Sequence, residues 1–302
     1  MADRVVLTIG TRKGVCVAEA AKPRRRFALR GPFGPGTPVY STLIDTRGTP
    51  RLYASSCSPF FGMKVLRSTD MGKTFKETKS APAFPKDDGR ALVNIWSLEA
   101  GGGKKDRKEL LCGVEPASLF RSHDAGDSWE MVPGISNHEH ARKWQPGAGG
   151  LCMHTIIRDG NRVHLGISTG GHYLSEDGGD TFTEIVDVKP SVFGFAVAAH
   201  PKIPDIAWFV PAIKDERRVA VDGRLVVNRT SDGGKTFEQL GSGLPEKDCF
   251  DLIYRHGLDV DATGETLAMG STTGNLWVGR GGGKRWTLVS AHLPPIAQVA
   301  FA

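Results

Sequence analysis

The sequence predicts an all-β fold, a six-bladed β-propeller of four-stranded antiparallel blades, and two observations lead to it. The first is a repeated eight-residue pattern. Its four clear copies contain Asp70, Asp124, Asp177 and Asp232, which by subtraction are 54, 53 and 55 residues apart. Periods of this length are typical of arrays in which each repeat is one supersecondary unit, propellers among them. The second is the 38 glycines and 18 prolines in 302 residues, which favour short strands and turns over long helices.

Each copy of the pattern has the chemistry of a turn that fastens itself. The pattern is Ser/Thr-x-Asp-x-Gly-x-Ser/Thr-aromatic, at residues 68–75 (STDMGKTF), 122–129 (SHDAGDSW), 175–182 (SEDGGDTF) and 230–237 (TSDGGKTF). An Asp side chain in a turn accepts hydrogen bonds from nearby backbone N–H groups, and the glycine two residues later permits a positive φ. We therefore predict a hairpin turn tied by the Asp and the hydroxyl groups. The aromatic residue begins the next strand and packs between neighbouring sheets.

This pattern resembles the Asp box, also called the BNR repeat, which occurs in sialidases, sortilin-type receptors, photosystem-assembly factors and many bacterial proteins. The resemblance covers nearly the whole chain. It implies that each box joins the third and fourth strands of a propeller blade, on the face opposite the ligand site. The four aspartates are therefore expected to be structural and not catalytic.

Two weaker boxes bring the count to six, which indicates six blades in one domain over residues 1–302. Residues 279–286 (GRGGGKRW) have Gly281 at the Asp position, and residues 20–27 (AAKPRRRF) have Lys22 there. Strands fall at regular offsets from the boxes; those of the last two blades are expected at 192–198, 206–210, 225–229 and 236–240, and at 251–258, 265–269, 275–279 and 285–289. Blade one has only three strands, at 4–9, 15–18 and 26–29. We predict that a strand at 297–301 pairs beside 4–9 and closes the ring, which leaves no exposed sheet edge.

Bulk composition excludes several classes of function. No stretch reaches the roughly 18 consecutive apolar residues of a membrane span, and the N-terminus lacks the regions of a signal peptide. We therefore expect a cytoplasmic protein without a membrane partner. The net charge is +6, but the basic runs fall in predicted turns without interleaved aromatics, so no nucleic-acid partner is expected. The oligomeric state stays open. The cysteines show no CxxC spacing, which favours buried apolar residues over disulfides or zinc ligands; they are Cys16, Cys57, Cys112, Cys152 and Cys249.

Functional residues are expected on loops of the face opposite the boxes, because binding residues are commonly mounted on loops over a rigid scaffold. The longest such loop is 133–150 (PGISNHEHARKWQPGAGG). Loops longer than about 12 to 15 residues in a compact domain are usually functional or disordered. The loop contains His138, His140, Trp144 and Gln145, and it leads to His154 on a predicted innermost strand.

Four phrases resemble a particular group of bacterial BNR-repeat proteins that are often labelled glycosyl hydrolase or exo-sialidase from the repeat alone. The phrases are GTRKGVCV, NIWSL, GVEPASLFRS and WQPGAGGLCMHTI. The resemblance implies a sialidase-like, glycosyl hydrolase-like fold, and it favours a hydrolase if the protein is an enzyme. The Arg-Ile/Leu-Pro segment that opens the sialidase motif set is absent, which argues against a true sialidase.

Glu115 is the preferred acid/base residue. It stands on a predicted blade-tip loop, where partial burial would raise a carboxyl pKa toward values useful for general-base catalysis. The structural alternative is a salt bridge to Arg12 or Lys13. His154 is the second catalytic candidate. Ligand binding is assigned to Arg12 and Lys13, as holders of an anionic group, and to Tyr40, Asn94, Trp96, Trp144, Gln145 and Arg255.

A divalent metal is the other chemical option. His138, His140 and His154, with Glu115 as an oxygen donor, have ligand types suited to zinc or a similar ion. The alternative interpretation is that His138 and His140 are solvated loop residues and that His154 is a hydrogen-bonded core residue. No other cofactor is indicated.

Two classes of function remain open on the sequence. The first is a protein that binds a small anionic or carbohydrate-like ligand at the channel mouth, as a hydrolase or lyase. The second is a non-catalytic protein-interaction or assembly scaffold. Convergent polar groups in a pocket would favour the first, and a broad face without buried charge would favour the second, since a propeller fold alone supports many functions.

Overall fold

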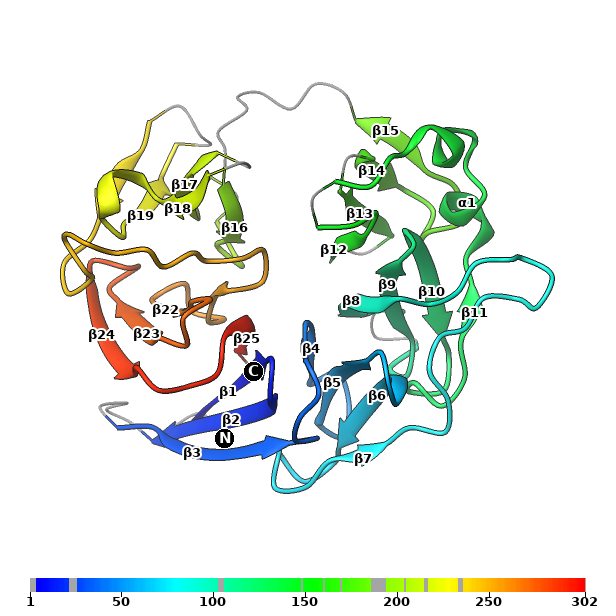
Figure 1. The fold of residues 1–302 in the computed structure, drawn as a ribbon, viewed down its shortest axis with the longest axis horizontal. Coiled ribbons are helices and arrows are strands. Elements are labelled where there is room, and N and C mark those ends of the chain that lie inside the picture. Colours follow the sequence, from blue (N-terminus) through cyan, green and yellow to red (C-terminus); the bar gives the residue numbers. More distant parts are fainter. Residues whose placement is uncertain are drawn as a thin grey trace. The chain divides into compact units, whose positions relative to one another are not determined.

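The computed structural model describes residues 4–21, 26–102, 106–147, 149–159, 161–168, 170–185, 194–203, 205–214, 217–232 and 236–301. The chain forms two compact units. Unit 1 comprises Met1–Gly36 and Pro190–Ala302, and unit 2 comprises Thr37–Lys189. Nearly all elements are β-strands (Figure 1). None of the described helices has the length and apolar character needed to span a bilayer.

Unit 2 contains three four-stranded antiparallel sheets whose strands follow chain order. The first consists of β4 (Thr42–Asp45), β5 (Arg51–Ser58), β6 (Gly62–Ser68) and β7 (Lys76–Glu77). The second consists of β8 (Asn94–Ala100), β9 (Leu110–Glu115), β10 (Ser118–Ser122) and β11 (Glu130–Met131). The third consists of β12 (Met153–Asp159), β13 (Arg162–Ile167), β14 (Gly171–Ser175) and β15 (Thr183–Ile185). These sheets are blades two, three and four.

Unit 1 contains the other three blades. Blade one has the order β25 (Ile296–Phe301), β1 (Arg4–Thr11), β2 (Gly14–Ala21) and β3 (Ala28–Phe33). Blade five consists of β16 (Gly194–Ala199), β17 (Ala207–Lys214), β19 (Val227–Thr230) and β20 (Glu238–Leu240), and β18 (Arg217–Ala220) pairs with β17. Blade six consists of β21 (Leu258–Val260), β22 (Thr266–Gly270), β23 (Leu276–Arg280) and β24 (Arg285–Ser290). The predicted class, six four-stranded antiparallel blades, is confirmed.

The C-terminal strand completes blade one, as the sequence predicts. β25 pairs antiparallel with β1, with Leu7 opposite Phe301 and Ile9 opposite Val299. Figure 1 shows this red strand beside the blue N-terminal strand. The innermost strand of the blade therefore comes from the far end of the sequence.

The predicted hydrogen bonds of the box turns are present. The Ser68 hydroxyl donates to Asp70 Oδ1 at 2.7 Å and accepts the Gly72 N–H at 2.9 Å. Asp70 accepts the N–H groups of Lys73 and Thr74 at 3.1 and 3.0 Å, and the Thr74 hydroxyl at 2.7 Å. The two hydrogen bonds from Thr74 hold the pKa of Asp70 well below its usual range, and the bond from the Thr74 backbone N–H has the larger effect. In the turns at Asp124, Asp177 and Asp232, the Asp carboxylate likewise accepts hydrogen bonds from the hydroxyl groups of the first and the last Ser/Thr of the pattern.

The two weaker boxes fall between the third and fourth strands of blades six and one. Gly281 stands in the turn between β23 and β24. In the other weak box, Lys22 lies outside the described residues. The closing aromatics pack where the sequence places them. Phe182 joins a core cluster with Leu119 of blade three, and Trp286 joins one with Trp208 of blade five.

The five cysteines are free and buried, which agrees with their interpretation as apolar core residues. Burial raises the pKa of Cys57 to about 11 and lifts the pKa of Cys112 well above its ordinary value. These two thiols therefore stay protonated at neutral pH.

Three predicted segments differ from the structure. The inner strand of blade six begins at Leu258 rather than at 251, because residues 251–257 leave the ladder in a turn closed by the Gly257 N–H on the Tyr254 carbonyl at 2.6 Å. Between the predicted strands 206–210 and 225–229, β17 continues to Lys214 and the additional strand β18 pairs with it. The predicted loop 133–150 contains α1 (Pro133–Ser136) and the short 3₁₀ helix η1 (Glu139–Lys143). Ile135 in α1 is buried, which is why this stretch packs instead of extending as a loop.

Candidate functional site

The innermost strands of blades three and four each contain one extra residue. The pairing of β8 with β9 shifts across Trp96, and the pairing of β12 with β13 shifts across His154. A β-bulge of this kind leaves the extra residue out of the ladder and turns its side chain to a new direction, and bulges are common beside active sites. Trp96 and His154, both sequence-predicted site residues, therefore occupy equivalent places in adjacent blades.

Blade two has the same feature just before β4. The Ser55 N–H bonds the Ser41 carbonyl at 2.9 Å, and the Cys57 N–H bonds the Pro38 carbonyl at 2.8 Å. Two residues, one of them Tyr40, therefore stand opposite the single residue 56. The Ser55 hydroxyl accepts the Tyr40 N–H at 3.2 Å, which satisfies a backbone donor that the bulge removes from the ladder.

Sequence reasoning missed the bulges, although a repeated glycine signals them. A Cβ at Gly113, opposite the bulge of blade three, would collide with Ser97 Oγ and with the Met153 carbonyl of blade four. A Cβ at Gly166, opposite the bulge of blade four, would stand 3.1 Å from His154 Cε1. Both glycines lie near the end of a second strand, in the phrases GVEP and GIST.

Four predicted residues meet in one place, which we name the Glu115 site: Glu115, Asn94, Trp96 and Tyr40. Glu115 Oε2 accepts the Trp96 indole N–H at 2.8 Å and the Asn94 amide at 3.3 Å. The rings of Trp96 and Tyr40 are tilted by 30° with centroids 4.9 Å apart. All four side chains are half-buried. The bulge at Trp96 makes this contact possible, because it brings the indole to the end of β9, where Glu115 stands.

The predicted long loop ends against the Glu115 site. Gly150 has φ +88°, and a Cβ there would collide with Glu115 Oε1. Another residue at this position would be strained by the backbone conformation and would displace the Glu115 carboxylate. The loop therefore supports the Glu115 carboxylate from one side, while Trp96 and Asn94 hold it from the other.

The loop's aromatic and histidine residues form a separate cluster on blade four. Trp144 donates its indole N–H to the hydroxyl of the fully buried Tyr173 at 3.0 Å. His140 Nδ1 lies 3.4 Å from that hydroxyl and 3.1 Å from Glu184 Oε2. The His138 ring packs edge-on against the rings of His140 and Tyr173. Burial raises the pKa of Tyr173, so the phenol stays neutral. Trp144 thus has a packing role here, and Gln145 beside it is exposed.

The three histidines predicted as metal ligands have different partners. His138 Nδ1 accepts the backbone N–H of His140 at 3.1 Å. His154 Nδ1 lies 2.8 Å from the Thr155 hydroxyl. Among the described residues, the three potential ligands that converge are instead Asp106, Glu109 and His123, within 4.8 Å of one another.

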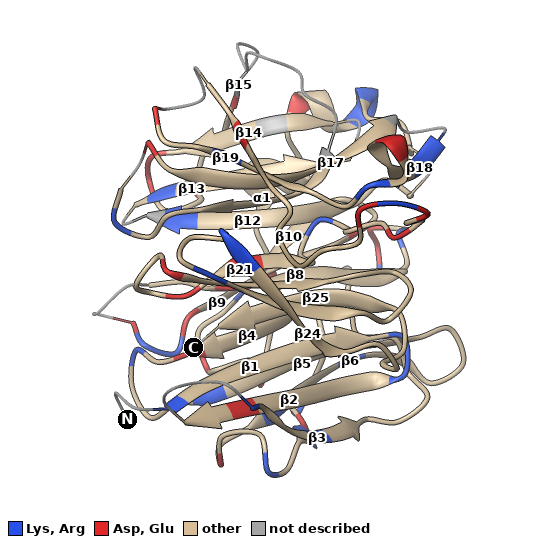
Figure 2. Ribbon diagram, turned by 90° about the vertical axis from the view of Figure 1, so that its left-hand side faces the viewer, with Lys and Arg blue, Asp and Glu red and all other residues tan. Residues whose placement is uncertain are grey.

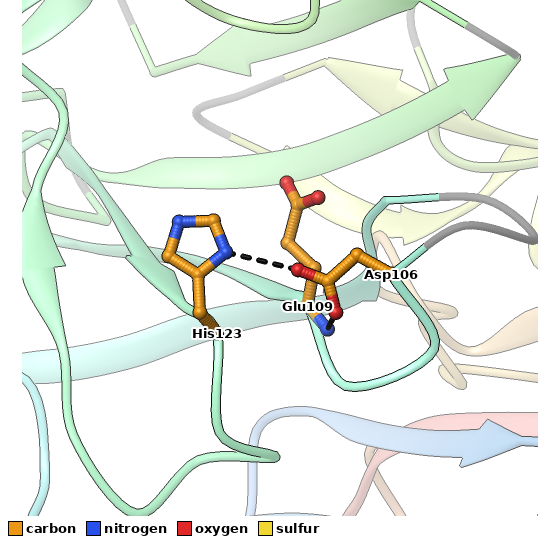
Figure 3. Close-up of side chains that lie close together, drawn as sticks. All are labelled: Asp106, Glu109 and His123. Atoms are coloured by element: carbon orange, nitrogen blue, oxygen red, sulfur yellow. Dashed lines mark hydrogen bonds and ion pairs between the residues drawn. The ribbon is translucent and has the colours of Figure 1, made fainter.

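That converging group, drawn in Figure 3, belongs to an ion-pair network. His123 Nδ1 lies 3.0 Å from Asp106 Oδ2, and this hydrogen bond raises the pKa of His123. Glu109 Oε1 lies 3.1 Å from Arg158 Nη1 and 3.5 Å from Arg121 Nε. Two guanidinium groups already pair with Glu109. The group therefore links blades three and four.

Three sequence-predicted ligand residues belong to unit 1. Arg12 and Lys13 are exposed in the turn between β1 and β2. The Arg12 N–H bonds the Pro295 carbonyl at 3.0 Å, and the Lys13 N–H bonds the Thr11 hydroxyl at 3.0 Å. Arg255 is half-buried in the turn that precedes β21.

The Glu115 site offers hydrogen-bond acceptance beside aromatic surface. Among the described residues, the side chains that hydrogen-bond Glu115 are Asn94 and Trp96, both neutral donors. An ionised carboxylate has about four lone-pair sites, so two donors leave it able to accept more. The arrangement leaves Glu115 able to accept hydrogen bonds from donors such as hydroxyl groups.

No protein-family model matches the sequence, and neither does any curated protein. Solved structures match in fold. A GH74 xyloglucanase from Xanthomonas campestris is 16% identical with a TM-score of 0.53, and the match covers 96% of this chain and 44% of that one. TolB from Acinetobacter baumannii is 10% identical with a TM-score of 0.53, over 100% and 67%. A functionally unknown protein from Desulfotomaculum acetoxidans is 11% identical with a TM-score of 0.51, over 99% and 86%.

These likenesses concern the fold. This chain spans less than half the length of the xyloglucanase. The names of the three proteins indicate no common function. The chain is therefore similar in fold to β-propellers that include a glycoside hydrolase.

Proposed function

We propose that this protein binds a neutral, carbohydrate-like small molecule at the Glu115 site. One observation carries the proposal: a half-buried carboxylate, held by Trp96 and Asn94, lies beside the paired rings of Trp96 and Tyr40. Ligand hydroxyl groups would donate to Glu115. The apolar C–H face of a sugar ring would lie on the aromatic pair. Sites with apolar and aromatic walls and a few placed polar groups are typical for small molecules.

The charge of the Glu115 site favours a neutral ligand over an anionic one. The side chains that hold Glu115 carry no positive charge, so an anionic group placed there would be repelled by the carboxylate. The anionic part of the sequence prediction depends on Arg12 and Lys13, which belong to unit 1. The proposal for unit 2 is therefore limited to hydroxyl-rich ligands.

Hydrolysis of the ligand is a separate matter from binding. Most glycosidases place two carboxyl groups on opposite sides of the scissile bond. Glu115 would supply one, as the acid/base residue that the sequence predicts. The proposal is binding, and bond cleavage is an additional outcome that product analysis in the same samples would reveal.

Titration calorimetry with cellotetraose and with a xyloglucan oligosaccharide tests the proposal. We expect at least one of them to bind the wild-type protein, and Glu115→Gln to weaken binding about tenfold, the loss of one charge-assisted hydrogen bond. Glu130→Gln, an exposed glutamate on β11, should leave binding unchanged. Absence of binding to both oligosaccharides, or equal losses in both variants, would contradict the proposal.

One observation favours the second candidate function, an interaction scaffold. Phe60 and Phe61, in the turn between β5 and β6, are 89% and 75% exposed. The Ser58 hydroxyl accepts both of their backbone N–H groups, at 3.2 and 3.1 Å, so the turn is ordered with its apolar side chains outward. Exposed apolar residues in such a place are typical of docking surfaces. If the scaffold role holds, the double variant Phe60→Ser/Phe61→Ser should lose a co-purifying protein that Glu115→Gln retains.

A further inference from the structure

The box of blade six lacks the side chains that fasten the four regular boxes. Gly279 and Gly281 stand at the first and third of the eight box positions, where the regular boxes have Ser/Thr and Asp. In blade two, the first residue's hydroxyl accepts the N–H of Gly72, the fifth residue, at 2.9 Å. The Asp carboxylate accepts the N–H of Lys73, the sixth residue, at 3.1 Å. Glycine offers no side-chain acceptor, so blade six cannot form these two bonds.

Two backbone N–H groups in blade six therefore have no side-chain acceptor. They belong to Gly283 and Lys284, at the fifth and sixth box positions, and among the described residues neither donates a hydrogen bond. Gly283 is buried, and buried backbone N–H groups are almost always paired. The turn thus presents two donors for an anionic group that this chain does not supply here.

The backbone of the turn is suited to an anion. Gly281, Gly282 and Gly283 have φ of +62°, +65° and +90°, and successive backbone N–H groups in turn conformations form nests that bind anions. The Gly282 N–H bonds the Glu265 carbonyl at 3.1 Å, and the Trp208 indole N–H donates to the Gly282 carbonyl at 2.8 Å. These two bonds hold the turn against its neighbours.

The side chains of the turn are cationic, which is a second observation, independent of the glycines. Arg280 ends β23 and Arg285 begins β24, and both strand ends are blue in Figure 2. With Lys284 they give residues 279–286 three basic residues and no acidic one, whereas each regular box contains one to three acidic residues. Lys284 and Arg285 are exposed, and neither forms an ion pair within the described part of the chain.

Neighbouring blades in unit 2 are linked at their boxes by an arginine and an acid. The arginine stands just before one box, and the acid is the sixth residue of the next box. Arg67 of blade two pairs with Asp127 of blade three at 3.2 Å. Arg121 of blade three pairs with Asp180 of blade four at 3.6 Å. The sixth box position therefore neutralises a guanidinium of the preceding blade.

Blade six reverses the charge at this position. Arg229 of blade five stands just before its box, but the sixth residue of the next box is Lys284. Arg229 Nη1 instead lies 2.9 Å from Glu238 of its own blade, and its buried Nε has no acceptor among the described residues. A Cβ at Gly282 would stand 3.9 Å from Arg229 Nε, so this guanidinium adds positive charge beside the turn.

We propose that the turn at residues 281–285 binds a phosphate group. Its oxygens would accept the N–H groups of Gly283 and Lys284, in place of the Ser and Asp oxygens of a regular box. The Lys284 ammonium and the Arg285 guanidinium would neutralise its charge. A phosphate is favoured over a carboxylate because it carries close to two negative charges and three acceptor oxygens. The site belongs to unit 1 and stands apart from the evidence for the Glu115 site, so the two proposals can fail separately.

Titration with sodium phosphate at constant ionic strength, followed in an amide correlation spectrum, tests this site. We expect saturable shifts of the Gly283 and Lys284 amide signals, and smaller shifts with sodium acetate at equal concentration. Methyl phosphate in a parallel titration distinguishes the source: if it binds too, the site takes phosphate monoesters, and if it is excluded, the site takes inorganic phosphate. Either result supports the site.

Lys284→Asp places an acid at the sixth box position, as in blades three and four, and its missing signal identifies the Lys284 amide. This variant should weaken phosphate binding at least about tenfold, since it removes one charge-assisted hydrogen bond and adds a negative charge. Lys73→Asp is the matched control, because it makes the same change at the same position of the blade two box. There Asp70 already accepts the backbone N–H groups, so phosphate binding should stay unchanged.

Three results would overturn the proposal: fixed Gly283 and Lys284 signals at high phosphate, equal shifts with phosphate and acetate, or equal losses in Lys73→Asp and Lys284→Asp. The comparison of phosphate with acetate uses the unaltered protein, so it decides the matter even if a variant unfolds. Glu115→Gln should leave phosphate binding intact, which separates this site from the Glu115 site.

Discussion

The backbone N–H of Phe301 donates to the carboxylate of Asp259 at 2.6 Å. Phe301 ends β25 of blade one, and Asp259 lies in β21, the inner strand of blade six. This bond ties the C-terminal strand to a second blade in addition to its ladder with β1. Burial raises the pKa of Asp259 from 3.8 to about 6, although the Phe301 bond acts in the opposite direction.

The variant Asp259→Asn should be more stable than the wild type at neutral pH. A raised folded-state pKa means that the protonated acid is favoured in the native state. Its stabilisation is full below about pH 4 and is lost as the pH rises through about 6. At most about 3 kcal/mol is involved, because the half-buried side chain keeps some screening by water. Asparagine keeps an acceptor for the Phe301 N–H without the charge.

Urea unfolding at pH 4.5 and pH 7.5 checks this prediction. The free energy of unfolding of Asp259→Asn minus that of the wild type should be larger at pH 7.5. This difference cancels the contributions that other titrating carboxylates make to the free energy of unfolding, because both proteins contain them. A constant difference across the two pH values would show that Asp259 does not titrate in this range.

The variant Asp124→Ala should lower stability through its box turn. Burial by itself would raise the pKa of Asp124, but hydrogen bonds from Ser128 and Ser122 lower it to about 2. The stabilisation is therefore present above about pH 4 and is lost as the pH falls toward 2. We expect a loss of about 1 kcal/mol at pH 7, measured by urea unfolding, and a smaller loss at pH 3. Glu130→Ala, an exposed residue nearby, should change little, and an equal loss there would refute the turn as the cause.

Removing the Tyr173 hydroxyl should reveal its coupling to Trp144. Tyr173→Phe leaves the buried indole N–H without its acceptor, which costs about 1 to 3 kcal/mol. The double variant Trp144→Phe/Tyr173→Phe removes both partners, so the losses of the two single variants should not add. Thermal or urea unfolding of the four proteins gives the coupling. Additive losses would mean that the hydrogen bond contributes nothing.

Gly150→Ala should weaken ligand binding at the Glu115 site. Alanine at this position is strained at φ +88° and collides with Glu115 Oε1. Gly62→Ala is the matched control, because Gly62 has φ +79° with no atoms near its virtual Cβ. Both variants should lose about 1 kcal/mol of stability from backbone strain, measured by urea unfolding. Only Gly150→Ala should reduce cellotetraose affinity in calorimetry, and an equal reduction in Gly62→Ala would contradict the role of the collision.

The sequence predicts the blades well because the box chemistry is local. Asp70 and Thr74 are four residues apart, so their hydrogen bonds follow from the pattern itself. The pairing of residues 297–301 with β1 also follows from the sequence. Blade one lacks its fourth strand, and 297–301 is the one predicted strand that belongs to no other blade. The start of blade six could not be predicted in this way, because residues 251–257 read as a strand until Gly257 closes its turn.

The residues of the Glu115 site can be predicted from the sequence, but part of their arrangement cannot. The sequence predicts Glu115 as a blade-tip residue and Asn94, Trp96 and Tyr40 as ligand-binding residues, and the structure brings the four together. The sequence also predicts His154 as a site residue, but its ring lies against the Thr155 hydroxyl. The spacing of residues in the sequence does not predict which rotamer a side chain adopts. The bulges were missed for a similar reason: a single inserted residue shifts the ladder without changing the apolar pattern that identifies the strand.

The indole N–H resonance of Trp96 offers the most direct measurement of the central claim. The chain has six tryptophans, so an amide correlation spectrum shows six indole signals, and Trp96→Phe identifies the relevant one. The Trp96 N–H donates to Glu115, so a ligand hydroxyl that engages this carboxylate must shift its signal. Titration with cellotetraose should move the Trp96 signal and leave that of Trp286, buried in blade six, in place. A Trp96 signal that stays fixed at saturating cellotetraose would contradict ligand binding at the Glu115 site.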